Sequence, residues 1–88
     1  MKKVLIIEDD LLVANIYRNK LAVEGFSVET ANTGETGFDL LKSFRPDVVI
    51  ISADLPGPGS PRETALGIRD GLGIPILVTA AHPVDTLS

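Results

Sequence analysis

Four short segments of the chain have the hydrophobic pattern of β-strands. Residues 4–7 and 48–51 are uninterrupted apolar runs rich in β-branched side chains, and such runs are typical of fully buried strands. Residues 26–30 alternate between apolar and polar positions, which predicts a strand with one exposed face. Residues 74–79 form a fourth run, in which Pro75 is tolerated because it lies at the beginning of the strand.

A first helix is predicted between the first two strands. Asp9 or Asp10 can cap its N-terminus, where negative charge is favourable, and Gly25 lies where such a helix ends. Its apolar positions recur three and four residues apart, which predicts one buried face. That face consists of Val13, Ile16, Tyr17 and Leu21.

A second helix is predicted between the second and third strands. Asn32 stands three residues before Glu35, the spacing of a capping box with asparagine as the cap. Pro46 disfavours helical backbone at the preceding residue and should end the helix. Its apolar stripe consists of Phe38, Leu41 and Phe44.

A third helix is predicted after a loop over residues 53–60, which contains two prolines and two glycines. Residues 60–63 read Ser-Pro-Arg-Glu, a cap followed by proline at the first helical position and by glutamate. Its stripe consists of Ala65, Ile68 and Leu72. Strands that alternate with helices predict an α/β domain with a doubly wound parallel sheet and right-handed crossovers.

Composition narrows the classes of function. The chain of 88 residues is long enough for one domain. Its net charge of −4 argues against a nucleic-acid partner and against attraction to an anionic membrane. No apolar run approaches the roughly 20 residues of a membrane span, and the apolar run after Met1 is too short for a signal peptide. The absence of cysteine excludes disulfides, zinc-thiolate sites and thiol catalysis.

Polar residues collect where three of the predicted strands end. Glu8, Asp9 and Asp10 follow the first strand, Ser52 and Asp54 the third, and Thr79 closes the fourth. In parallel sheets such ends share one edge, and sites lie there. Clustered carboxylates are ligands that Mg²⁺ prefers, and a hydroxyl opposite them could bind a phosphoryl oxygen. The same residues could also be a helix cap and an ordinary strand end.

Five stretches make the sequence resemble a receiver domain of bacterial response regulators, the signalling proteins of two-component phosphorelays. They are residues 4–10 (VLIIEDD), 24–26 (EGF), 45–51 (RPDVVII), 55–57 (LPG) and 74–80 (IPILVTA). The resemblance implies a flavodoxin-like, CheY-like fold with strand order 2-1-3-4-5. It also implies transfer of a phosphoryl group from a partner histidine kinase to an aspartate of the receiver, with Mg²⁺.

Several residues match functional positions of the receiver family. Glu8 and Asp9 match its acidic metal pair, Thr79 the hydroxyl residue that contacts the phosphoryl group, and Ala80 the small residue after it. The resemblance thus implies a site at the carboxyl edge of the sheet.

The phosphoacceptor position departs from the family pattern. The acceptor aspartate lies four residues before the proline of the Leu-Pro-Gly segment, and counting back from Pro56 gives Ser52. A serine hydroxyl is a poor nucleophile without a general base, and serine also removes a carboxylate from the metal site. We therefore expect at most weak Mg²⁺ binding by Glu8 and Asp9. The alternative is a working receiver in which Asp54 serves as a substitute acceptor.

The chain ends shortly after the fourth predicted strand. We expect a truncated receiver of about four strands and three helices over residues 1–80, with a tail over 81–88, and without the family's conserved lysine. The fourth strand would be an open edge, and the face of the first helix would be partly bare, which favours a homodimer. We expect a cytoplasmic interaction module that is not an enzyme, with a histidine kinase or another receiver as further partners.

Overall fold

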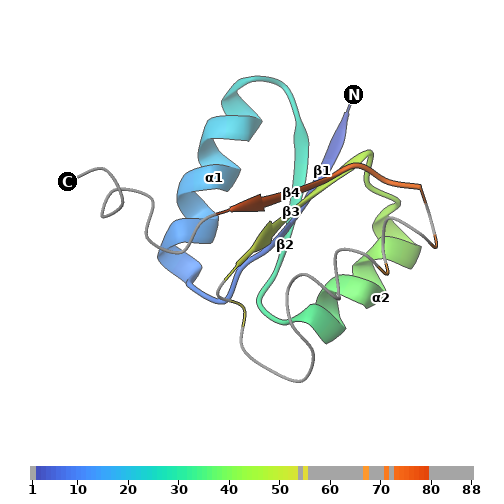
Figure 1. The fold of residues 1–88 in the computed structure, drawn as a ribbon. Helices are drawn as coiled ribbons and strands as arrows, with labels where there is room; N and C mark the ends of the chain where they lie inside the picture. Colours follow the sequence, from blue (N-terminus) through green and yellow to red (C-terminus); the bar gives the residue numbers. More distant parts are fainter. Residues whose placement is uncertain (1, 54, 56–66, 68–70, 72, 80–88) are drawn as a thin grey trace.

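The computed structural model describes residues 2–53, 55, 67, 71 and 73–79. Its elements follow the order of the predicted ones (Figure 1). The predicted third helix lies almost wholly outside the described residues, as do Asp54, Ala80 and the predicted tail. The elements are β1 (Lys3–Ile7), α1 (Leu11–Val23), β2 (Ser27–Ala31), α2 (Gly34–Phe44), β3 (Val48–Ser52) and β4 (Ile76–Thr79).

The four strands form one parallel sheet in the order β2-β1-β3-β4. Helix α1 lies on one side of this sheet and α2 on the other (Figure 1). The predicted α/β class and the parallel, doubly wound arrangement are therefore confirmed. Among the described strands, β2 and β4 lie at the two edges.

The main core lies between the sheet and α2. Leu5 and Ile7 of β1 pair in register with Val49 and Ile51 of β3, and these four side chains have no solvent exposure. Since neighbouring strand residues point to opposite faces, these four share the α2 face. The buried cluster consists of Leu5, Ile7, Ala31, Leu41, Val49, Ile51 and Leu55.

Helix α1 is capped by Asp10, one of the two predicted candidates. Its Oδ1 accepts hydrogen bonds from the backbone N–H groups of Leu12 at 3.0 Å and Val13 at 3.3 Å. Ala14 is the buried residue of this helix, and Ile16 is 49% exposed. The prediction that Ile16 lies on the buried face was wrong, because the helix turns its small Ala14 toward the sheet.

Helix α2 begins one residue later than the capping-box spacing predicted. The cap is Thr33, whose hydroxyl accepts a hydrogen bond from the backbone N–H of Thr36 at 3.1 Å. Gly37 and Leu41 face the core, whereas Phe38 is 41% exposed. The predictions of an Asn32 cap and of a buried Phe38 were therefore wrong.

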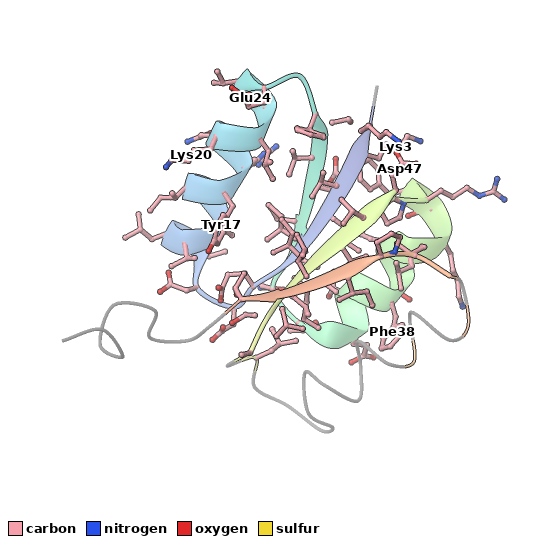
Figure 2. The ribbon with its side chains drawn as sticks, turned by 45° about the horizontal axis from the view of Figure 1, so that its top comes forward. Lys3, Tyr17, Lys20, Glu24, Phe38 and Asp47 are labelled. Atoms are coloured by element: carbon pink, nitrogen blue, oxygen red, sulfur yellow. The ribbon has the colours of Figure 1, made fainter. Side chains whose placement is uncertain are left out.

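Lys3 and Asp47 join the amino ends of β1 and β3 to the end of α2. The backbone N–H of Lys3 donates to Asp47 Oδ2 at 2.8 Å, and the backbone N–H of Asp47 donates to the Lys3 carbonyl at 2.8 Å. The Lys3 ammonium donates to the Phe44 carbonyl at 3.2 Å and lies 5.5 Å from the centre of its ring. Figure 2 shows Lys3 and Asp47 side by side at this edge.

The length and polarity of the helices bear on a membrane location. Within the described part of the chain, no helix is both long and apolar enough to cross a bilayer.

Candidate functional site at the carboxyl edge of the sheet

The sheet register brings Glu8, Ser52 and Thr79 to neighbouring positions at the carboxyl edge. Ile7 pairs with Ile51, so Glu8 and Ser52 are the next residues of adjacent strands, and Ser52 pairs with Thr79. Ile7 and Ile51 face α2, so the next residues, Glu8 and Ser52, face the α1 side of the sheet. Thr79 faces the same side as its partner Ser52. Asp9 follows Glu8 directly, is exposed, and interacts with the Glu8 side chain.

Glu8 is the most buried carboxylate among the described residues, with 8% exposure. Its Oε2 accepts a hydrogen bond from the backbone N–H of Asp10 at 3.1 Å. Burial raises the pKa of Glu8 above its ordinary value of 4.5, and the interactions with Asp9 and the charge of Asp10 raise the pKa further, against the lowering effect of the backbone hydrogen bond. Adding negative charge beside Glu8 is therefore unfavourable unless a cation compensates it.

Ser52 and Thr79 line the edge with hydroxyl groups. Ser52 is buried, with 5% exposure. The Thr79 hydroxyl donates to the Ile51 carbonyl at 3.5 Å, and the Thr79 carbonyl accepts from the backbone N–H of Ala53 at 3.0 Å. These two hydrogen bonds join the end of β4 to the end of β3, which is an ordinary structural role for a residue at a strand end.

The described residues fit a resident Mg²⁺ ion poorly. They contain no group of three or more acidic or histidine side chains placed to hold a metal ion. One oxygen of Glu8 is engaged with a backbone N–H group, and Ser52 contributes no carboxylate. Because Mg²⁺ demands near-octahedral oxygen ligation, the described residues offer it too few oxygen ligands.

A hollow of about 240 Å³ lies on the β2 side of Glu8. Sequence reasoning missed it, because it considered the ends of β1, β3 and β4 but not the polar residues where β2 ends. Thr30 and Asn32 were the residues in the sequence that could have indicated this hollow. The hollow is lined by Glu8, Leu11, Ala14, Thr30, Ala31, Asn32 and Thr36.

A comparison with family models finds a match to the response regulator receiver domain over residues 4–86. Among characterised proteins, the response regulator MprA of Mycolicibacterium vanbaalenii is 35% identical over 81 residues, covering 91% of this chain and 35% of that protein. The transcriptional regulatory protein AfsQ1 of Streptomyces coelicolor is 34% identical over 85 residues, covering 97% of this chain and 37% of that protein. This chain thus spans about a third of the length of these relatives.

Solved structures show the same fold. The signal receiver domain of a modulated diguanylate cyclase from Desulfovibrio desulfuricans has a TM-score of 0.86 at 30% identity, over 98% of this chain and 70% of that one. The response regulator TrrA of Thermotoga maritima, solved with Mg²⁺ and BeF, has a TM-score of 0.84 at 28% identity, over 99% and 77%. These similarities confirm the resemblance and the CheY-like, flavodoxin-like fold.

Proposed function

This chain belongs to the response regulator receiver family of two-component signalling, and we propose that it acts there as a phosphorylation-independent interaction and dimerisation module. The observation that carries the proposal is the residue at the acceptor position, where Ser52 stands at the end of β3 beside Glu8 and Thr79. We infer that the module is not an enzyme and works in the cytoplasm. A histidine kinase or another receiver is its expected partner besides a second copy.

The chemistry of Ser52 supports this proposal. An aspartate acceptor attacks phosphorus with a carboxylate that is already ionised, and Mg²⁺ offsets the charge that gathers on the phosphoryl oxygens. A serine hydroxyl must lose its proton to a general base as it attacks. Its position at the edge with only 5% exposure also restricts the approach of a phosphodonor.

Phosphorylation of Asp54 is the competing function. Asp54 follows Ser52 by two residues and lies outside the described residues. The 88-residue chain should be incubated with acetyl phosphate and Mg²⁺ and its intact mass recorded. We expect no added phosphoryl group. A single added group that disappears in the Asp54→Asn variant would establish Asp54 as the acceptor, with Glu8 and Asp9 as its metal residues.

Exposed apolar side chains support self-association. On α1, Leu11 is 67% and Leu12 is 71% exposed, and on β4 Leu77 is 60% exposed. Exposed apolar patches can mark interaction sites, and the backbone of an edge strand, as β4 is among the described strands, can pair with another chain. Sedimentation velocity at micromolar concentration should show a dimer, and a compact monomer throughout would contradict the proposal.

A further inference from the structure

The hollow on the β2 side of Glu8 is separate from the edge formed by β3 and β4. It measures about 240 Å³, and none of its lining residues comes from β3 or β4. The lining comes from the ends of β1 and β2 and from the first turns of α1 and α2, which follow these strands (Figure 1). We call it the β2 hollow, and neither Ser52 nor Thr79 lines it.

Glu8 is the only charged side chain that lines the β2 hollow. It is 8% exposed, and no lysine or arginine in the described part of the chain lines the hollow beside it. Burial, and then the charges of Asp9 and Asp10, raise the pKa of Glu8. A positive group in the hollow would offset this crowding of negative charge.

Two further side chains of the β2 hollow offer oxygen acceptors. Thr30 lies in β2, and Asn32 follows the strand. Within the described residues, neither the Thr30 hydroxyl nor the Asn32 side-chain amide has a hydrogen-bond partner, and each contains an oxygen that can accept. The carboxylate of Glu8 has about four acceptor sites, of which the backbone N–H of Asp10 occupies one. The hollow therefore suits a ligand with several N–H donors.

The helix starts beside the β2 hollow do not favour an anion there. The N-terminus of a helix attracts negative charge through its free backbone N–H groups. On α1, however, Asp10 Oδ1 accepts from the N–H groups of Leu12 and Val13. On α2, the Thr33 hydroxyl accepts from the N–H of Thr36. These N–H groups already have partners within the chain, so the charge of Glu8 decides the sign of the ligand.

We propose that the β2 hollow binds the guanidinium group at the end of a short alkyl chain. A guanidinium is planar, carries its N–H donors in a fixed fork that matches a carboxylate, and is more weakly hydrated than an ammonium group. The fork donates to Glu8, and its remaining N–H groups donate to the oxygens of Thr30 and Asn32. The alkyl stem packs against Leu11 and Ala14, the apolar residues of the lining from α1.

The volume of the β2 hollow limits the ligand to a group of side-chain size. Pockets for drug-sized ligands measure about 300–1,000 Å³, and this hollow is smaller. An arginine side chain of a partner protein and a free small guanidinium compound both meet this limit. The inference goes beyond the proposed function and does not depend on self-association, because a single copy of the chain supplies the whole lining.

Titration of the isotope-labelled chain, followed by NMR in the presence of EDTA, tests the site. Propylguanidinium should shift the amide resonances of Glu8, Ala31 and Asn32 with a dissociation constant of about a millimolar. Propylurea has the same shape without the charge and should bind at least about tenfold more weakly. A blocked tripeptide with a central arginine distinguishes the sources, because matching shifts indicate a partner's side chain and binding of propylguanidinium alone indicates a free compound. An equal response to propylurea, or no response to propylguanidinium, overturns the inference.

Matched variants test the role of Glu8. Glu8→Gln keeps the size of the side chain without its charge and should weaken propylguanidinium binding at least about tenfold. Glu29→Gln is the control, because Glu29 is an exposed carboxylate that precedes Thr30 on the other face of β2, and it should leave the affinity unchanged. Asn32→Ala changes an exposed residue that the fold does not need, and it should weaken binding about two- to tenfold. Equal affinities of all three variants and the unmodified chain would overturn the site, whatever the oligomeric state of the chain.

Discussion

Replacing Gly37 with alanine tests how closely α2 approaches the sheet. A Cβ at this position would lie 2.5 Å from Cδ1 and 2.9 Å from Cγ1 of Ile7. Ile7 has no exposed surface, so it cannot move aside without displacing the rest of the core. Overpacking of this kind costs about 1–3 kcal/mol, whereas alanine in place of a helical glycine contributes about 1 kcal/mol. We expect a net loss of up to about 2 kcal/mol.

Urea unfolding measures this loss as a lower midpoint concentration, with no change in the slope of the unfolding free energy against urea concentration. Gly34→Ala is the matched control, because a Cβ there would meet only Leu55 Cδ2 at an ordinary 3.8 Å. That variant should equal or exceed the stability of the unmodified chain. Ile7→Val removes the nearer of the two clashing atoms, so the double variant should lose less than the sum of the single losses. A Gly37→Ala chain that gains as much stability as the Gly34→Ala chain would refute the close approach.

Three further predictions concern caps, titration and the strand ends. Thr33→Ala should destabilise the fold by about 1 kcal/mol in urea unfolding, and Asn32→Ala should change stability clearly less. Since the pKa of Glu8 is raised in the native state, the folded chain holds a proton that the unfolded chain has released, and stability should fall as pH rises from about the ordinary value of 4.5 through the raised pKa. Glu8→Gln should flatten this dependence, and a steeper profile would contradict it. Asp47→Ala removes the acceptor of the Lys3 N–H and should cost about 0.5–1 kcal/mol, with a larger loss pointing to wider disruption.

The strands were predictable because their signal is local. Uninterrupted apolar runs at residues 4–7 and 48–51 have no alternative but burial on both faces, and both became central strands. Which side of each helix faces the sheet was not predictable in the same way. Both α1 and α2 carry more apolar residues than one face holds, so hydrophobicity alone could not choose between faces.

Small residues made that choice. Ala14 is the buried residue of α1, and Gly37 of α2 lies directly against Ile7 of the sheet; neither contributes to a predicted apolar stripe. Ile16 and Phe38 were consequently left exposed. At the site, the neighbouring positions of Glu8, Ser52 and Thr79 depend on strand order, which came from the family resemblance rather than from the periodicity of any segment.

Serine at the acceptor position and the exposed apolar side chains of α1 and β4 are linked by an argument about conformational states. An interface that phosphorylation controls has to be hidden in one state and exposed in the other, and the added phosphoryl charge supplies the difference. Ser52 adds no charge to the edge that holds Glu8, so no such switch is driven from this position. On the proposed function, an interface of this chain is available at all times, which is consistent with Leu12, Val23 and Leu77 being more than half exposed. Its occupancy would be set by the concentration of the chain, through mass action, rather than by phosphorylation.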